Sequence, residues 1–380
     1  GVITTPGVAY LARSRGMSAG VVISASHNPW TDNGIKVFSG DGFKLTDARE
    51  LAIEKEIFAL LKNPAAADDT ALKVPRPSLP GEASLRHAYI QSLIANVSSD
   101  LSGLRLLVDC ANGAATAEAP ELFRALRIKA TFLHISPDGK NINERCGALH
   151  PEILGKAVAD AREKFDLGVT FDGDADRALF CDATGRVVNG DGVLLAAARD
   201  LHAQGKLKAD TVVSTTMSNM GLEIALKNSG IRMLRANVGD KYVLEEMLKT
   251  GATLGGEQSG HIIFRDGDST TGDGLLTALR LMDIIVRSGK PLADLVADLK
   301  VFPQKIQNVR VREKIPFAQV PAIQSAIAAG ERELGGNGRI VVRYSGTEAL
   351  ARVMVEAESE AKMQSITTSI AQEIQKALGI

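Results

Sequence analysis

Three aspartates are clustered in one short segment, Asp172-Gly-Asp-Ala-Asp-Arg177, directly after the apolar run 167–171. The run predicts a buried strand, so the carboxylates of Asp172, Asp174 and Asp176 would share the turn at which this strand ends. Carboxylates held this close repel one another, and a bound cation removes the repulsion. Because carboxylate oxygens are hard ligands, the segment predicts a Mg²⁺ site rather than a zinc or copper site.

Two other interpretations of the acidic segment differ in how well they fit. A calcium-binding EF-hand loop does not fit, because Arg177 occupies the sixth position, which requires glycine, and Ala183 occupies the twelfth, which requires glutamate. A solvated acidic turn without a metal remains an alternative when the segment is taken alone.

A second polar turn, residues 24–29, follows a short β-branched strand predicted at 21–23. Ser26 therefore lies where α/β proteins often place reactive groups, at the change from strand to loop. Serine is a poor nucleophile at neutral pH and needs a base or a charged partner, for which His27 and Lys36 are candidates. We expect Lys36 in a tight turn, with a pKa lowered by burial and cationic neighbours. Taken singly, Ser26 and His27 are more typical of turn or capping residues.

Two further loops carry polar side chains beside glycines. The first, residues 255–261, contains Glu257, Ser259 and His261, a mixture of acceptors and donors that suits the hydroxyl groups of a sugar. The second, residues 343–352, combines arginines and hydroxyls with a glycine and predicts a phosphate-binding loop. It is not a nucleotide P-loop, because no Gly-Lys-Ser/Thr follows the glycine. The residues expected to bind phosphate are Arg343, Ser345, Gly346, Thr347 and Arg352.

These four loops, in this order, resemble the loops of the α-D-phosphohexomutase superfamily, and the resemblance runs along the whole chain. Within the superfamily the chain is most similar to the phosphoglucosamine mutase branch, and the phosphoglucomutase/phosphomannomutase branch is the alternative. The segments that favour the first branch are 23–29, Ala175, Gln258, 141–143, Cys146-Gly147 and 150–152.

The resemblance implies a reaction in which Ser26 carries a phosphoryl group. Mg²⁺ would be held by Asp172, Asp174, Asp176 and an oxygen of the phosphate on Ser26. The phosphoserine would phosphorylate glucosamine 6-phosphate to a bisphosphate, which would return its other phosphate and leave as glucosamine 1-phosphate.

The resemblance also implies roles for the other loop residues. Lys36 resembles the family's general acid/base, while Arg177 and His27 would hold the phosphoserine. The sugar would be bound by Glu257 and Ser259, with His261 beside them, and the non-reacting phosphate by the loop that begins at Arg343. Gly239 and Asp240 match a segment that orients the sugar, although a helix N-terminus capped by Asp240 explains these two residues equally well.

The chain departs from the family at two places. Tyr344 and Ala349 stand where the family usually has proline. The family also has several dozen residues before the position of Gly1, which contribute a first strand and helix, so we expect this chain to be a fragment or an N-terminally cleaved form. A catalytically silent sugar-phosphate binder is therefore a second hypothesis. A magnesium-dependent phosphatase is a third, although such enzymes use an aspartate nucleophile and need no Ser26.

Composition restricts the class of protein. The 380 residues include 44 Lys+Arg and 45 Asp+Glu, so no basic surplus is available to bind nucleic acid or an anionic membrane. No apolar run approaches the length of a membrane span. The three cysteines lack the spacing of a disulfide framework or a zinc site, which favours a cytoplasmic enzyme. The resemblance is compatible with a homodimer.

Strands alternate with helices along the chain and predict α/β architecture with doubly wound sheets. We expect three doubly wound, mixed-sheet α/β domains and a smaller C-terminal α+β domain. The first domain, residues 1–84, is partial and ends in a Pro-, Ala- and Asp-rich linker at 63–84. The second domain, 85–190, carries the metal loop, the third, 191–300, carries the sugar loop, and the fourth, 301–380, binds phosphate.

Overall fold

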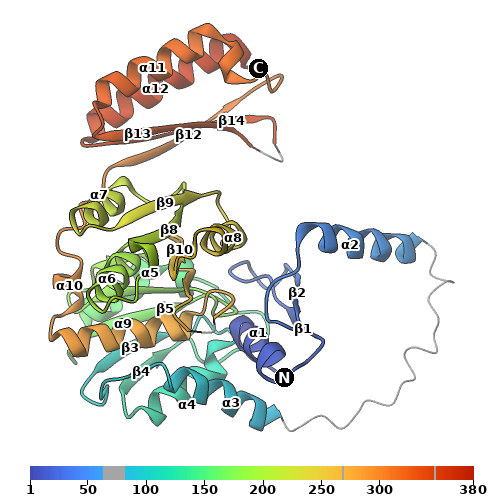
Figure 1. The fold of residues 1–380 in the computed structure, drawn as a ribbon, viewed down its shortest axis with the longest axis vertical. Helices are drawn as coiled ribbons and strands as arrows, with labels where there is room; N and C mark the ends of the chain where they lie inside the picture. The colour runs from blue at the N-terminus through green and yellow to red at the C-terminus, as the bar shows by residue number, and fades with distance from the viewer. Residues whose placement is uncertain (63–81, 268, 346–347) are drawn as a thin grey trace. The chain divides into compact units, whose positions relative to one another are not determined.

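The computed structural model describes residues 1–62, 82–267, 269–345 and 348–380 (Figure 1). The chain forms two compact units, the first comprising 1–217 with 231–296 and the second 218–230 with 297–380. Most of the predicted linker lies outside the described residues, but its last residues are helical, because helix α3 begins at Glu82. Among the described residues, no helix is long and apolar enough to cross a membrane.

The N-terminal segment carries the predicted Ser26 turn on a two-stranded antiparallel sheet. Thr4 caps the first helix by accepting a hydrogen bond from the Gly7 amide, and Pro6 lies in its first turn, where its missing N–H costs nothing. Strand β1 pairs with β2 so that Ile23 is opposite Ile35, which leaves residues 24–34 as the connecting loop. The elements are α1 (Thr5–Ser14), β1 (Ala19–Ile23), β2 (Ile35–Ser39) and α2 (Asp47–Lys62).

The second sheet is mixed, in the order β4-β3-β5-β6-β7. Strands β4, β3 and β5 are parallel, whereas β5, β6 and β7 are antiparallel. All residues of β5 and β6 are buried, as expected for apolar strands in the middle of a sheet, and the acidic segment is the turn between them. The elements are α3 (Glu82–Ile94), β3 (Arg105–Asp109), α4 (Ala115–Ala125), β4 (Lys129–Leu133), α5 (Pro151–Asp160), β5 (Leu167–Phe171), β6 (Ala178–Asp182) and β7 (Val187–Val188).

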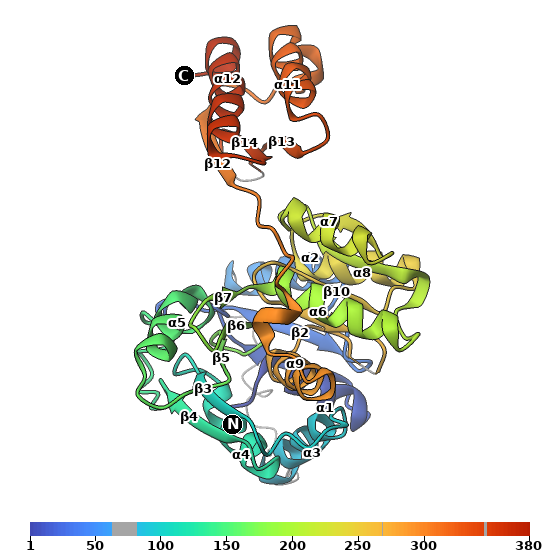
Figure 2. The ribbon, with the colours of Figure 1, turned by 90° about the vertical axis from the view of Figure 1, so that its left-hand side faces the viewer.

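The third sheet has the order β11-β10-β8-β9, with β10, β8 and β9 parallel and β11 antiparallel. Helices α6 and α8 pack on β10, and α6 also packs on α9 (Figure 2). The elements are α6 (Gly190–Ala203), β8 (Thr211–Thr215), β9 (Arg232–Ala236), α8 (Asp240–Thr250), β10 (Leu254–Gly256), β11 (Ile262–Phe264), α9 (Gly274–Ser288) and α10 (Leu292–Leu295).

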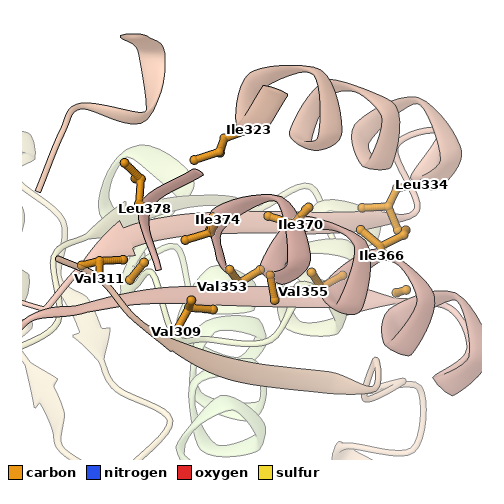
Figure 3. Packing of buried hydrophobic residues seen from close by; sticks show 13 residues of the cluster. Val309, Val311, Ile323, Leu334, Val353, Val355, Ile366, Ile370, Ile374 and Leu378 are labelled. Atoms are coloured by element: carbon orange, nitrogen blue, oxygen red, sulfur yellow. The ribbon is translucent and has the colours of Figure 1, made fainter. Parts of the chain in front are cut away.

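The second unit contains a three-stranded antiparallel sheet in the order β12-β14-β13, and helices α11 and α12 pack against it. Its core is formed by aliphatic side chains of the sheet and the two helices, including Val353, Val355 and Ile370 (Figure 3). The elements are α7 (Met220–Asn228), β12 (Gln304–Arg310), α11 (Pro321–Leu334), β13 (Gly338–Tyr344), β14 (Leu350–Ala357) and α12 (Glu360–Leu378). The predicted fold class is confirmed, while the four domain boundaries stay a prediction.

Candidate active site

The acidic turn places three carboxylates together in the interior of the first unit. Asp172, Asp174 and Asp176 are 0%, 3% and 4% exposed, and each offers an oxygen within 4.8 Å of the others. Within the described part of the chain, Oδ1 of Asp174 and Oδ1 of Asp176 are buried without a hydrogen-bond partner. Burial of a carboxylate oxygen without a hydrogen-bond donor costs free energy, and coordination of a cation by these oxygens would remove that cost.

Lys36 lies on strand β2, not in the tight turn expected from the sequence. The strand directs its Nζ to Oδ2 of Asp174 at 2.5 Å and to Oδ2 of Asp176 at 3.2 Å. Burial opposes the charge of the ammonium group, but the two carboxylates outweigh it and raise the pKa of Lys36. The predicted lowering of this pKa is therefore wrong, because anionic rather than cationic neighbours surround the amine.

The three carboxylates titrate differently because their neighbours differ. Burial, together with the charges of Asp176 and Asp174, raises the pKa of Asp172 well above its ordinary value. Burial acts in the same direction on Asp176, but His261, Lys36 and Arg177 hold its pKa well below the ordinary value. The turn thus contains one carboxyl group that favours the neutral form beside one that is strongly ionised.

Ser26 reaches the acidic turn from the loop after β1. Its Oγ donates to Oδ2 of Asp172 at 2.8 Å, and Nδ1 of His27 lies 3.4 Å from the same Oγ. Burial and the Arg177 guanidinium lower the pKa of His27, so this imidazole favours its neutral form. Ser26 has a backbone φ of +54°, a left-handed conformation that few residues other than glycine adopt. The hydroxyl therefore stands beside the carboxylates in a strained backbone conformation, which is common at reactive positions.

Arg177 ends the acidic turn and faces back toward it. Its backbone N–H donates to Oδ1 of Asp172 at 3.2 Å, and its Nε lies 3.8 Å from both Oδ2 of Asp172 and Oδ1 of Asp176. The Nε makes no hydrogen bond within the described residues. A guanidinium with an unused buried donor is suited to bind an anion that arrives beside Ser26.

The predicted sugar-binding residues lie in the same unit, on two neighbouring segments. Glu257 accepts a hydrogen bond from the Gly239 amide at 3.0 Å, and the Ser259 hydroxyl lies 3.4 Å from its other oxygen. Asp240 is the first residue of α8, but its side chain does not cap the helix. The Asp240 carboxylate instead forms an ion pair with Lys44 and lies 3.5 Å from Nε2 of His261. The expected helix N-terminus is therefore confirmed, but its N-cap is Gly239, and capping by the Asp240 side chain is wrong.

His261 links the sugar-binding segments to the acidic turn. The Gly272 amide donates to its Nε2 at 3.0 Å, which leaves the ring proton on Nδ1 when the imidazole is neutral. This Nδ1 lies 3.6 Å from Oδ1 of Asp176. His261 is 2% exposed, so its position between the two loops is fixed by packing.

Backbone hydrogen bonds join the two loops directly. The Ala178 amide at the start of β6 donates to the Gly260 carbonyl, and the Gly274 amide at the start of α9 donates to the Ala175 carbonyl. The Gly190 amide donates to the Gln258 carbonyl, and a Cβ at position 190 would lie 2.0 Å from the Glu257 carbonyl oxygen. The acidic turn, the predicted sugar-binding loop and the starts of α6 and α9 therefore form one hydrogen-bonded frame.

Two residues that were not predicted from the sequence, Thr5 and Lys44, contact predicted site residues. The Thr5 hydroxyl donates to Oδ2 of Asp174 at 2.5 Å, and Lys44 forms the ion pair with Asp240. Thr5 carries no chemical signal in the sequence, because a threonine before Pro6 at a helix start is ordinary. Lys44 is one of 44 basic residues and has no motif around it.

The predicted phosphate-binding loop belongs to the second unit. Arg343 and Arg352 are directly opposite each other on β13 and β14. Like charges at such a cross-strand pair are unfavourable, and an anion between them would remove the cost. Nη2 of Arg352 lies 3.5 Å from the Ser345 hydroxyl and 3.2 Å from Glu348. Gly346 and Thr347 lie outside the described residues.

Tyr344 accounts for the absence of the family's proline in this loop. Its ring stacks on Phe317 with centroids 4.2 Å apart, and its hydroxyl donates to the Ile315 carbonyl at 2.5 Å. The tyrosine therefore fixes the end of β13 by side-chain packing, where proline would have done so by restricting the backbone.

The residues of the acidic turn fit a divalent metal ion. They supply three hard carboxylate ligands, two of which hold unsatisfied oxygens, and a lysine ammonium already provides positive charge at this position. A metal-binding triad is what the geometry supports.

Comparison with known proteins identifies the class. Four stretches match the alpha/beta/alpha domains I, II and III and the C-terminal domain of phosphoglucomutase/phosphomannomutase, at residues 1–63, 87–185, 189–302 and 307–373 respectively. The chain therefore belongs to the phosphoglucomutase/phosphomannomutase family of phosphohexomutases.

Two curated relatives of high identity are phosphoglucosamine mutases. The chain is 62% identical over 382 residues to a phosphoglucosamine mutase of Koribacter versatilis, covering 100% of this chain and 82% of that protein. It is 54% identical over 379 residues to the phosphoglucosamine mutase of Solibacter usitatus, covering 100% and 83%.

Solved structures share the fold at lower identity. A phosphoglucomutase/phosphomannomutase family protein of Burkholderia thailandensis has a TM-score of 0.75 and 22% identity, covering 100% of this chain and 83% of that one. An N-acetylphosphoglucosamine mutase of Aspergillus fumigatus, in complex with GlcNAc-6P and magnesium, has a TM-score of 0.69 and 21% identity, covering 98% and 92%.

Proposed function

We propose that this chain interconverts glucosamine 6-phosphate and glucosamine 1-phosphate through a phosphoserine at Ser26 and a bisphosphate intermediate. The observation that carries the proposal is the Ser26 Oγ, which lies 2.8 Å from Asp172 within a buried acidic triad. The 62% identity to a phosphoglucosamine mutase along the whole chain supports the choice of sugar.

The residues of the site divide the reaction between them. In the first transfer, the bond between Ser26 Oγ and phosphorus breaks while a bond forms from the free hydroxyl oxygen of the sugar phosphate to phosphorus. The sugar hydroxyl gives up its proton, and Ser26 Oγ gains one. We assign both proton transfers to Lys36, which the two carboxylates keep charged. Its ammonium would give a proton to Ser26 Oγ, and the amine so formed would take up the proton of the sugar hydroxyl, which restores the ammonium. The reverse transfer uses the other phosphate of the bisphosphate and restores the phosphoserine.

Charge neutralisation accounts for most of the catalysis of such a transfer. Arg177 and His27 flank Ser26 and would contact the oxygens of its phosphoryl group. Mg²⁺ bound to Asp172, Asp174 and Asp176 would withdraw further charge from the same oxygens. We expect removal of the ion with EDTA to abolish turnover and added Mg²⁺ to restore it.

Binding of the sugar uses the frame beside the triad. Glu257 and Ser259 offer an acceptor and a hydroxyl, while Asp240 and the Gly239 backbone adjoin them. Arg343, Ser345, Gly346, Thr347 and Arg352 are assigned to the phosphate that does not react. The pairing of Arg343 opposite Arg352 supports this assignment.

The test is a coupled assay that compares the 6-phosphates of glucosamine, glucose and mannose, together with the intact mass of the purified protein. A higher kcat/KM for glucosamine 6-phosphate and a covalent phosphoryl group on Ser26 are expected. A higher kcat/KM for glucose or mannose 6-phosphate would indicate the phosphoglucomutase/phosphomannomutase branch instead. Binding without turnover, with Ser26 unmodified, would assign a sugar-phosphate binder.

A further inference from the structure

The side-chain amide of Asn143 makes two hydrogen bonds to the loop that carries Ser26. Its Nδ2 donates to the carbonyl oxygens of Ser26 and of Asn28, each at 3.0 Å. Asn143 comes from a different part of the chain, the loop between β4 and α5, and is 8% exposed. One side chain thus uses both of its N–H donors on the two carbonyls that flank His27.

Asn143 is itself held by the second sheet. Its backbone N–H donates to the Ala111 carbonyl at 2.9 Å, in the loop that follows β3. The buried carboxylate of Asp109, the last residue of β3, accepts from the amides of Ala111 and Gly147, each at 2.9 Å. Asn143 has a φ of +58°, which asparagine tolerates better than most residues. The position of Asn143 is therefore fixed by β3, which pairs with β5, and the acidic turn follows β5.

Asn143 connects the Ser26 loop to the second sheet. The strands on either side of the loop, β1 and β2, form a sheet of only two strands among the described residues. Gly173 of the acidic turn approaches the loop so closely that a Cβ there would lie 2.5 Å from the Ser26 carbonyl oxygen and 2.8 Å from Nδ2 of Asn143. The carbonyl of Ser26 therefore fits between the acidic turn and the Asn143 amide, with no room to move toward the turn.

We propose that Asn143 is a positioning residue for phosphoryl transfer, which sets the place of Ser26 Oγ relative to the acidic triad without touching the substrate. This inference rests on the proposed function, in which Ser26 carries the phosphoryl group. Ser26 has a strained left-handed backbone, so loss of the two hydrogen bonds lets the loop relax. A displacement of about 1 Å at a reacting group lowers the rate about a hundredfold.

The experiment compares Asn143→Ala and Asn143→Asp with Asn141→Ala. Asn141 is the matched control, because within the described part of the chain its side chain bonds only to the exposed residues Ser136 and Asp138 of its own loop. We expect Asn143→Ala to lower kcat about tenfold to a hundredfold while KM stays unchanged. Asn143→Asp should lose more, since a carboxylate would face two carbonyl oxygens. Asn141→Ala should leave kcat unchanged.

Hydrogen exchange of the amides at 24–28 gives a readout that does not depend on turnover. Faster exchange in both Asn143 variants, at an unchanged midpoint of urea unfolding, supports positioning. An unchanged kcat, a rise in KM alone, or a kcat loss that only parallels a loss of global stability would overturn it. If Ser26→Ala retains turnover, the proposed function fails, whereas the exchange data still decide whether Asn143 holds the loop.

Discussion

Replacement of Lys36 by methionine tests whether this lysine balances the charge of the acidic triad. The substitution keeps the length and the apolar stem of the side chain but removes the ammonium that lies 2.5 Å from Asp174 and 3.2 Å from Asp176. Removal of one partner of a buried ion pair costs about 3–5 kcal/mol. Because the Lys36 side chain is 22% exposed and water can partly replace it, we expect a loss near the lower limit, about 3 kcal/mol, in the metal-free protein.

The assay is urea unfolding of wild type and Lys36→Met, each with EDTA and with Mg²⁺. A ligand at a hundred times its Kd stabilises the folded state by about 2.7 kcal/mol. The variant has one positive charge fewer at the triad, so Mg²⁺ should bind it more tightly and stabilise it more than wild type. Lys55→Met on helix α2, where the lysine is exposed, is the control and should change neither curve. Equal stability of Lys36→Met and wild type in EDTA would refute the charge-balance argument.

Three further substitutions test the rest of the site and the core. Ser26→Ala should abolish turnover in the coupled assay because it removes the phosphoryl carrier, and it should lower the free energy of unfolding by about 1 kcal/mol because the hydroxyl no longer donates to Asp172; retained turnover would exclude Ser26 from the role of carrier. Arg343→Lys should raise KM more than it lowers kcat, since a point charge replaces a bidentate fork at a phosphate that does not react, and a collapsed kcat at unchanged KM would place Arg343 at the transferring group. Glu118 is buried on α4, its carboxyl oxygens have no hydrogen-bond partner within the described residues, and burial raises its pKa from 4.5 to about 8. The folded state keeps this proton to a higher pH than the unfolded state, so the free energy of unfolding of wild type should fall as pH rises from 4.5 to about 8. In urea unfolding at pH 5 and pH 8, Glu118→Gln should not show this fall. An equal change between the two pH values in wild type and variant would contradict the prediction.

The sequence predicted the parts of the site that depend on local chemistry. The acidic turn and the Ser26 loop are short segments in which residue type, spacing and a preceding apolar run carry the signal, and both lie where strands end. The environment of Lys36 could not be predicted, because it arises when β2 brings the amine to carboxylates that are distant in the chain. Thr5 and Asn143 were missed as contacts for a similar reason, since each acts through a partner in another segment.

The same division holds for the fold. The strand β5 is predicted because burial on both faces leaves a continuous apolar run. Strand β12, with the sequence QKIQNVR, gives no such signal, because one of its faces is exposed and its residues are mostly polar. Its place in the sheet comes from pairing with β14, which is a tertiary contact.

The hydrogen-bonded frame of the first unit also bears on how such an enzyme can acquire a new substrate. Ala178, Gly190 and Gly274 are joined to the two loops through backbone atoms, so exchange of the side chains of Glu257, Gln258 or Ser259 leaves these bonds in place. The side chains proposed to meet the sugar can therefore diverge while the segments proposed to transfer the phosphoryl group keep their geometry. Gly190 itself cannot be exchanged in this way. Any larger side chain there would collide with the loop backbone and displace both loops, because they are joined by hydrogen bonds.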